Sequence, residues 1–583
     1  MADRDNPPHG AEGSRERGAI KKDWGGKTSI ALVYPNVYRT AMSNLGYQLL
    51  YALLNKKSDI VAERVFLPEK KGDSLRPEGG KGLVSVESLS PLQRFDVIAF
   101  SLPFENDFPN VLKILELGKI PVLQEERNAS HPVVMAGGVT TFLNPEPLAL
   151  FMDFFLLGEA EPVLDTLLDV LSDIRTHSLG RNELLKTLAR LVPSVYVPSL
   201  YDLQYHRDGT IQFRVPKESW IPEKVQAACQ RGPDFPIAKS TILTPETAFG
   251  DRVLVELGRG CGRSCRFCAA GYAYRPPRVH PEDRLLSCIE EVTETCPRLG
   301  LISAAVSDTP GIERLTGTIL ERGGTFSVSS LRADSLTPEL VENLKRAGQK
   351  TLAIAPEAGS ERLRRTINKH LTRDQIIEAV RLIARIGTFG LRLYFMVGLP
   401  TETPEDVEEI LELVKTIRHH VIKESSTRGR IGKIHLSVNC FIPKASTPFQ
   451  WFPMEQVSIL KEKQKRLRRA VGREGGVTVS FDVPKWAYVQ TLLSMGDRRV
   501  GKILVRVHEK GGDWQKAFRF SELNPDFFVY RPKGLDEILP WDFIDHGIHK
   551  EHLVTEYKLA LKGKESDVCR VGECERCGVC RTL

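Results

Sequence analysis

The sequence has no run of apolar residues long enough to cross a membrane. A membrane span needs about 18 to 20 uninterrupted apolar residues, and no stretch of the 583-residue chain approaches that length. The opening segment, MADRDNPPHGAEGSRERGAIKKDWGG, is polar and lacks the apolar stretch of a secretion signal. The sequence therefore predicts a cytoplasmic protein with no membrane partner.

Neither sign of charge dominates the chain. It has 81 Lys and Arg against 74 Asp and Glu, which gives a net charge of +7. So small an excess permits a nucleic acid partner without requiring one. One basic run could contact phosphate, although a solvated helix face explains it at least as well. Its cations are Lys461, Lys463, Lys465, Arg466, Arg468 and Arg469.

The eleven cysteines do not suggest a disulfide framework. A reducing cytosol disfavours disulfides, and seven of the eleven fall into two close groups. Such grouping indicates metal binding. The other four, Cys229, Cys288, Cys296 and Cys440, are isolated.

The chain is too long for one hydrophobic core, so several domains are expected. Short β-rich runs alternate with helical stretches in two regions, which predicts an α/β multidomain fold. The first region favours a doubly wound, Rossmann-like sheet, and the second a partial (β/α)6 barrel. The predicted divisions are a flexible tail at 1–28, the α/β domain at 29–178, a β-rich connector at 179–248, the barrel at 249–455 and a small C-terminal domain at 456–583.

Three cysteines follow the first strand of the predicted barrel: Cys261, Cys265 and Cys268. Three thiolates can ligate three irons of a 4Fe-4S cluster and leave the fourth iron open to a ligand. Glycines at 258, 260 and 262 would let the loop wrap closely around such a cluster. A structural zinc ion is the alternative, but it normally takes four ligands and no fourth lies nearby.

The pattern Cys-x3-Cys-x-Phe-Cys, with Phe267 before the last cysteine, resembles the signature of the radical S-adenosylmethionine (SAM) superfamily. The resemblance implies that SAM binds at the open iron, that Phe267 belongs to the cofactor site, and that one-electron reduction cleaves SAM to a 5'-deoxyadenosyl radical. It also implies an electron donor such as flavodoxin or ferredoxin.

The resemblance continues at later strand ends, where barrels of this kind gather their catalytic groups. The residues it implies for holding SAM are Ser329, Arg332, Glu357, Ser360 and Gly398. Ser329 and Ser360 could equally be turn or helix-cap residues. Arg275 and Arg278, beside the cysteine loop, could pair with an anionic ligand or form structural salt bridges.

The front domain carries three loops at the predicted carboxyl ends of its strands, where doubly wound domains bind large ligands. They read Ala41-x-Ser43-x-x-Gly46, then Ser101-x-Pro103, then Gly137-Gly138. Cobalamin-binding domains that show Asp-x-His-x-x-Gly, Ser-x-Leu and Gly-Gly are similar.

Ser43 stands where those domains have the cobalt-ligating histidine, and residues 29–130 contain no histidine. The region nevertheless resembles the cobalamin-dependent branch of the superfamily, in which that histidine is often missing. The run around Glu159 and Glu161 contributes to this resemblance. It implies that Ser43, Gly46, Ser101, Gly137 and Gly138 border cobalamin. A domain that keeps the fold without the ligand is the alternative.

The chain ends in a second group of four cysteines: Cys569, Cys574, Cys577 and Cys580. Four thiolates within a dozen residues can close a metal site completely, and both zinc and a second iron-sulfur cluster suit short Cys-x2-Cys units. A tail with reactive thiols is the remaining interpretation.

Three functions follow from these patterns. The first is a radical SAM enzyme that uses cobalamin to methylate or otherwise modify an unactivated carbon, with the cofactors supplying the chemistry. The second is sulfur or methylthio transfer to RNA with a second cluster. The third is an RNA-binding or assembly factor with structural metal sites. The sequence does not identify the substrate, and RNA is one candidate.

Overall fold

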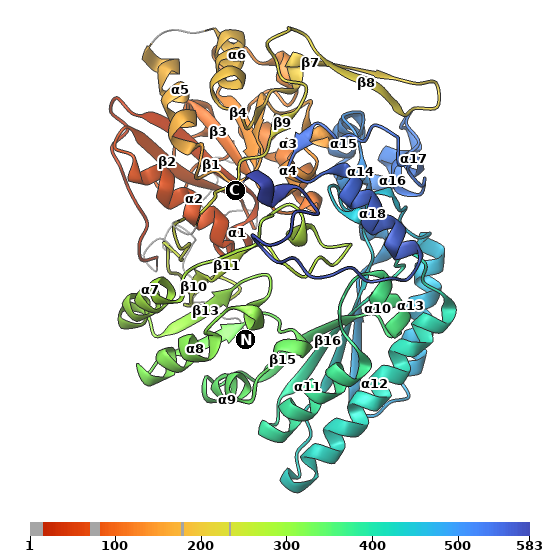
Figure 1. Cartoon of the computed structure of the whole chain (residues 1–583). Coiled ribbons are helices and arrows are strands. Elements are labelled where there is room, and N and C mark those ends of the chain that lie inside the picture. The colour runs from red at the N-terminus through yellow and green to blue at the C-terminus, as the bar shows by residue number, and fades with distance from the viewer. Residues whose placement is uncertain (1–15, 70–81, 177–179, 233–234, 583) are drawn as a thin grey trace, which may run out of the picture.

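The computed structural model describes residues 16–69, 82–176, 180–232 and 235–582. Figure 1 shows a front α/β domain at the top, a strand-and-helix barrel region at the bottom, and the C-terminal helices at the side. The main hydrophobic core runs without a break from the front sheet through the barrel. The parallel sheets and the helices packed on them confirm the predicted α/β multidomain fold.

A six-stranded sheet forms the front domain, in the order β2-β1-β3-β4-β5-β6. All neighbouring strands run parallel except β5 and β6. The chain passes from β1 to β2 on one side of β1 and then from β2 to β3 on its other side, so the strand order reverses at β1, as in doubly wound folds. The strands are β1 (Thr28–Val37), β2 (Ile60–Leu67), β3 (Val97–Ser101), β4 (Val133–Gly137), β5 (Phe154–Leu156) and β6 (Val195–Tyr196).

Helices cover this sheet, and its central strands are accordingly apolar and buried. They are α1 (Tyr38–Met42), α2 (Leu45–Lys56), α3 (Phe108–Leu117), α4 (Val139–Leu143), α5 (Leu164–Thr176) and α6 (Arg181–Leu191). Helix α2 begins after Asn44, whose side chain accepts the Tyr47 N–H at 2.9 Å. This N-cap places the start of α2 at the carboxyl end of β1.

The barrel region has two parallel sheets, β10-β13-β14 and β15-β16-β17-β18. A bridge between Leu331 and Ile354 links the two sheets. The strands are β10 (Val253–Glu256), β13 (Arg298–Ile302), β14 (Thr325–Val328), β15 (Thr351–Glu357), β16 (Gly390–Val397), β17 (Ile434–Cys440) and β18 (Val477–Phe481). Six of these match the predicted strands, and β18 adds a seventh by pairing with β17.

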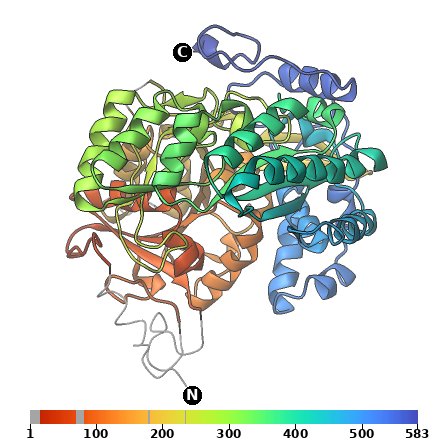
Figure 2. The ribbon, with the colours of Figure 1, turned by 90° about the horizontal axis from the view of Figure 1, so that it is seen from below.

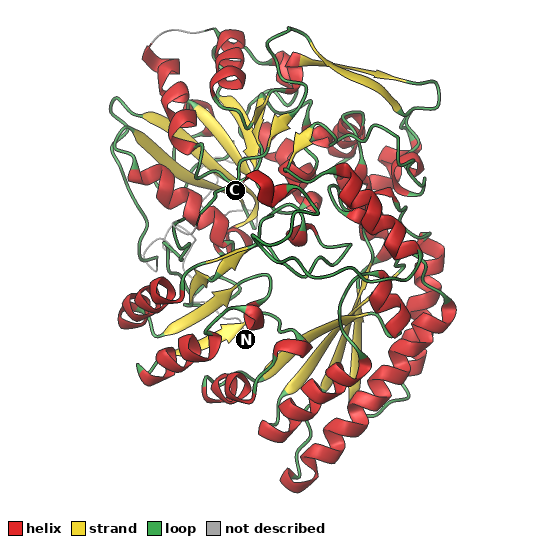
Figure 3. Cartoon of the chain, in the orientation of Figure 1, coloured by secondary structure: helices red, strands yellow, loops and turns green. Residues whose placement is uncertain are grey.

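Helices pack along the outside of these strands (Figure 3). They are α7 (Glu282–Thr295), α8 (Ile312–Glu321), α9 (Pro338–Arg346), α10 (Glu361–Thr366), α11 (Arg373–Ile386), α12 (Pro404–Ser425) and α13 (Val457–Val471). Helices α11 and α12 each begin with a capping box, at Thr372 and at Thr403.

The remaining elements tie the two large regions together. Strand β9 (Val225–Gln226) of the connector pairs with β19 (Ile544–Asp545), and β7 (Tyr201–Tyr205) forms a hairpin with β8 (Ile211–Pro216). Four α-helices lie between β18 and β19: α14 (Pro484–Met495), α15 (Val500–Glu509), α16 (Trp514–Arg519) and α17 (Asp526–Val529). Helix α15 packs against α3 of the front domain.

The last helix, α18 (Lys550–Leu561), and the segment after it lie on the outside of the barrel region, as the turned view shows (Figure 2). Among the described residues, no helix combines the length and the apolar character that crossing a bilayer requires.

Candidate functional site

The three loop cysteines lie between β11 (Gly258–Arg259) and β12 (Arg278–Val279), two short strands that pair antiparallel. Because β11 and β12 pair with each other, the two ends of the cysteine loop lie side by side. A Cβ at Gly260 would collide with the carbonyl oxygen of Tyr274, and the φ of Gly260 is +77°. Glycine is therefore required there for close approach and for backbone angle.

Burial governs the chemistry of the thiols in this loop. Cys265 is 9% exposed, and burial raises its pKa. Burial, followed by the charges of Cys265 and Cys261, raises the pKa of Cys268 to about 12. The three thiols are thus close enough to influence one another, and metal binding offsets the cost of ionising them. Three neighbouring thiols on one loop fit a 4Fe-4S cluster.

Two cations lie beside Cys265 and favour its thiolate form. Both Lys369 and Arg332 act to lower the pKa of Cys265, against the larger effect of burial. Lys369 Nζ lies 3.2 Å from Glu357 Oε1, and Arg332 donates to the Lys369 carbonyl at 3.2 Å. This arrangement provides positive charge next to a negatively charged thiolate centre.

Arg263 extends the charged network from within the cysteine loop. Its guanidinium pairs with Asp308 at 2.8 Å and with Asp334 at 3.0 Å, and Asp334 also binds Arg332 at 2.9 Å. The network ties the cysteine loop to the ends of the barrel strands.

Phe267 anchors the loop on apolar side chains. It packs against a second, small core whose buried members are Ala358, Leu363, Ile367, Leu399, Phe441, Phe449 and Ala560. Leu399 and Phe441 follow the carboxyl ends of β16 and β17. The aromatic ring therefore holds the cysteine loop at the mouth of the barrel.

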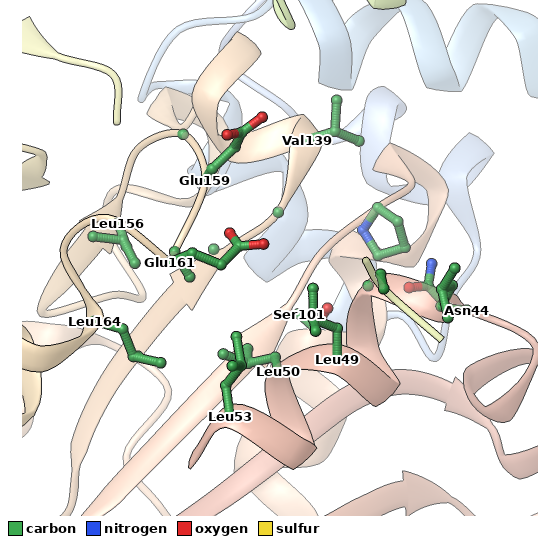
Figure 4. Close-up of a pocket in the computed structure, with 18 of the residues that line it drawn as sticks. Asn44, Leu49, Leu50, Leu53, Ser101, Val139, Leu156, Glu159, Glu161 and Leu164 are labelled. Carbon is green, nitrogen blue, oxygen red and sulfur yellow. The ribbon is translucent and has the colours of Figure 1, made fainter. Parts of the chain in front are cut away.

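A cavity of about 510 Å³ lies between the front sheet and the cysteine loop (Figure 4). On one side it is bordered by the strand ends of the front domain, on the other by Gly260, Ala270 and Tyr274 of the loop. Leucines of α2 and α5 line its depth, including Leu53 and Leu164. The cavity thus joins the two regions that the sequence singled out.

Charged groups gather where the cavity meets the barrel. Arg278 donates to Glu159 at 2.6 Å, and Arg259 binds Glu161 at 2.7 Å and Glu256 at 3.0 Å. The Glu159 and Glu161 side chains stand along one wall in Figure 4, and the leucines of α2 form its lower end. A ligand would meet an apolar depth and a polar rim, as in most ligand pockets.

Known families match both halves of this arrangement. The family described as "Radical SAM superfamily" matches residues 255–414, and "Radical SAM proteins, N-terminal" matches residues 46–198. The "Uncharacterized protein MJ0966" of Methanocaldococcus jannaschii is 32% identical over 478 residues, which cover 82% of this chain and 90% of that protein. The chain belongs to the radical SAM superfamily.

More distant proteins also match this radical SAM protein. The "tRNA-2-methylthio-N(6)-dimethylallyladenosine synthase" of Methylococcus capsulatus is 26% identical over 221 residues, 33% of this chain and 46% of that synthase. The solved structure of the methyltransferase TsrM from Kitasatospora setae, with cobalamin and a [4Fe-4S] cluster bound, is 12% identical with a TM-score of 0.45, covering 71% of this chain and 75% of that one.

The residues implied for SAM lie at several strand ends of the radical SAM barrel. Glu357 ends β15 with a φ of +67°, and Gly398 follows β16 with a φ of +81°. Ser329 is exposed just after β14. Ser360 is the N-cap of α10: its hydroxyl accepts the Leu363 N–H at 3.1 Å and donates to Asp406. Their roles toward SAM stay predictions.

Four of the five residues implied for cobalamin line the cavity: Gly46, Ser101, Gly137 and Gly138. Ser43 does not line the cavity. Its hydroxyl instead donates to the Arg39 carbonyl at 2.6 Å and accepts the Ala248 N–H at 2.8 Å. Gly138 passes close to Leu102, and its φ is +109°.

The terminal cysteines of this radical SAM protein lie next to the cysteine loop. The N–H of Cys569 donates to the Gly262 carbonyl at 2.7 Å. Charges of Cys574, Cys577 and Cys580 all act on the Cys569 thiol, so the four are neighbours. Among the described residues, no three or more Cys, His, Asp or Glu side chains are gathered tightly enough to hold one metal ion.

The basic run forms α13, and half of its cations have acidic partners or an aromatic contact. Lys463 binds Glu402 at 2.6 Å, Arg466 pairs with Glu408, and the Arg468 guanidinium lies 5.1 Å from the Phe481 ring centroid. The pairing favours a solvated helix face over a phosphate-binding surface.

Sequence reasoning missed Lys369 and Arg263, two of the cations that lie near the loop cysteines. Arg263 lies inside the motif, so its position two residues after Cys261 was a usable signal. Lys369 lies far along the chain in a segment without a recognisable pattern, and only the fold brings it to Cys265.

Proposed function

We propose that this radical SAM protein is an enzyme that uses a 4Fe-4S cluster, SAM and cobalamin to methylate, or otherwise modify, an unactivated carbon. The observation that carries the proposal is the cavity shared by the front strand ends and the cysteine loop. A single cavity of this kind would hold a large front-domain ligand within reach of the loop.

When bound, the cluster supplies the electron that cleaves SAM, and cobalamin supplies a carrier for a methyl group. Cys261, Cys265 and Cys268 would hold the cluster through their thiolates. Lys369 and Arg332 would balance the charge of this centre, because both already lie beside Cys265. The protein's task is to orient these groups and to exclude water.

The cobalamin part of the proposal rests on the cavity walls. Gly46, Ser101, Gly137 and Gly138 would border the ligand, and the leucines of α2 and α5 would contact its apolar parts. Residues 29–130 contain no histidine, so no imidazole from these loops would ligate cobalt. Ser43 would lie behind the cavity wall.

The proposal includes a second metal centre at Cys569, Cys574, Cys577 and Cys580, either an iron-sulfur cluster or zinc. It also includes a one-electron donor protein such as flavodoxin or ferredoxin.

A second candidate function is sulfur or methylthio transfer to RNA. The position of the terminal thiols beside the cysteine loop favours it, and so does the name of the synthase from Methylococcus capsulatus. Sulfur in the product, detected by mass spectrometry, would select this function over methylation.

We expect Gly138→Ala to weaken cobalamin binding by about tenfold or more. A Cβ at this position would lie 2.8 Å from the Leu102 carbonyl oxygen, and the φ of +109° strains any other residue, at a cost of roughly 1–3 kcal/mol. The strand end and α4 would shift where they border the cavity. Cobalamin bound after anaerobic reconstitution, read by visible absorbance, measures the effect.

Gly180→Ala is the matched control, because its added Cβ would meet nothing within 4 Å. Iron content should remain that of the wild type in both variants. If the wild-type protein binds no cobalamin, the front domain is a scaffold and the cobalamin proposal fails.

A further inference from the structure

The C-terminal arm, residues 550–582, contacts the cysteine loop at several points. Arg266 of the loop is fully buried, and its guanidinium lies 3.0 Å from Glu556 of α18. The same guanidinium donates to the Lys564 carbonyl at 2.8 Å. The first half of the arm therefore packs on the residue between Cys265 and Phe267.

The arm also contacts the loop that follows α10. Asn368 and Ser566 exchange two hydrogen bonds, at 2.9 and 3.2 Å. The His370 N–H donates to Glu565 at 3.1 Å. Lys369, the cation beside Cys265, lies between Asn368 and His370 in the sequence. The arm thus supports both sides of the first thiolate centre.

Arg275 connects the cysteine loop to the terminal thiols. Arg275 is 6% exposed, and its guanidinium donates to the Gly271 carbonyl at 2.7 Å and to Ser264 Oγ at 2.8 Å. Arg275 also contacts the arm, since its Nη1 lies 3.5 Å from Nε2 of His552 in α18. Burial alone would lower the pKa of Arg275, and the charges of Tyr272, Cys577 and Cys569 raise it. No ion pair of the described residues joins Arg275 to a carboxylate.

A buried guanidinium is costly without an anion nearby. Four thiolates around zinc, or around an oxidised 4Fe-4S core, leave a net charge of about −2. Either centre would provide the missing anion at the position of the terminal cysteines. The positive charge of Arg275 would therefore complement the negative charge of a metal centre held by the terminal thiolates.

We propose that Arg275 is the counter-ion of the second metal centre, and that this centre fastens the C-terminal arm onto the radical SAM loop. The inference rests on the second metal centre of the proposed function. Cys569 binds the carbonyl of Gly262, the neighbour of Cys261. Metal bound to the tail would hold the arm, and with it the loop that carries the first cluster.

The metal test uses the full-length chain with Cys261, Cys265 and Cys268 replaced by alanine, so that bound metal reports the tail alone. The protein is reconstituted anaerobically, once with iron and sulfide and once with zinc, and the bound metal is quantified. We expect one centre per chain with one of these metals. Arg275→Gln should weaken its binding by about tenfold or more, a typical effect of losing a residue that supports metal ligands.

Arg278→Gln is the matched control, because Arg278 is also buried and lies three residues further along but pairs with Glu159. It should leave the affinity for the tail metal unchanged. Absence of any metal in this background would overturn the second centre itself. Metal bound by Arg275→Gln with unchanged affinity would overturn only the role of Arg275.

Hydrogen-deuterium exchange in the same background tests the fastening. Metal should slow exchange of the 262–275 and 550–570 backbone, and it should have no such effect in Cys574→Ser/Cys580→Ser. The double variant Glu565→Ala/Ser566→Ala keeps the thiols and Arg275 but loses the hydrogen bonds that the Glu565 and Ser566 side chains make to the loop after α10. This variant should still bind metal, but the backbone amides of its arm should exchange faster than those of the metal-loaded chain without the two substitutions. Equal exchange with and without metal would overturn the fastening.

Discussion

Replacing Cys261, Cys265 and Cys268 together by alanine is expected to abolish SAM cleavage and to remove about four irons from each chain. The three thiols are the ligands that the loop offers for a cluster. Burial raises the pKa of Cys265 and Cys268, and alanine has no atom that could ligate iron in their place. Iron and sulfide analysis and detection of 5'-deoxyadenosine measure the two losses.

The control for this variant is Cys288→Ala. Cys288 is a buried cysteine of α7, outside both cysteine groups, and its replacement should leave iron content and SAM cleavage unchanged. Retention of SAM cleavage in the triple variant would contradict the assignment of the three cysteines.

Replacing Arg498 by glutamine is expected to lower the free energy of unfolding by about 3–5 kcal/mol, because it leaves a buried charge without its partner. Arg498 Nε lies 2.9 Å from Glu146 Oε2, and Glu146 is fully buried in the front domain. The Tyr196 hydroxyl also donates to Glu146. Urea denaturation at pH 7, followed by fluorescence, measures the loss.

The pH dependence of this loss has a definite sign. Burial alone would raise the pKa of Glu146, but Arg498, Arg214 and Tyr196 hold it below its ordinary value. The wild-type contribution is therefore present above pH 4.5, the ordinary value, and declines as pH falls through the lower folded pKa. In Arg498→Gln the pKa of Glu146 rises above the ordinary value, so the carboxyl takes up a proton on acidification. The deficit should be largest near pH 7 and smaller at pH 5.

Arg365→Gln serves as the control for an exposed pair. Arg365 lies 2.7 Å from Glu361 and is 55% exposed, and such pairs contribute about 0–1 kcal/mol. An equal loss in both variants, or a deficit in Arg498→Gln that does not change with pH, would contradict the account of Glu146.

Features with a local cause were predictable from the sequence. The alternation of apolar strands and helical segments predicted the front sheet and the strands of the barrel region, because burial on both faces demands continuous apolar strands. The cysteine loop was also visible, since all its ligands lie within eight residues. Gly137 and Gly138 were found for the same reason: one short segment contains both residues and the end of β4.

Features that depend on distant segments were not predictable. Gly262 and Cys569 are more than 300 residues apart, and nothing in either segment signals their hydrogen bond. Strand β18 has only five residues after a charged helix, too few for its alternation to stand out. Ser43 matched a loop pattern by position, yet its hydroxyl turns to the connector at Ala248. In each case a partner elsewhere in the chain decides the outcome.

The measurement that tests the central claim most directly is SAM cleavage by the full-length chain after anaerobic reconstitution with iron, sulfide and cobalamin. The account predicts bound cobalamin, about four irons at the cysteine loop with about four more if the tail holds a second cluster, and 5'-deoxyadenosine after one-electron reduction. Protein that carries the reduced cluster and binds SAM, yet forms no 5'-deoxyadenosine, would contradict it.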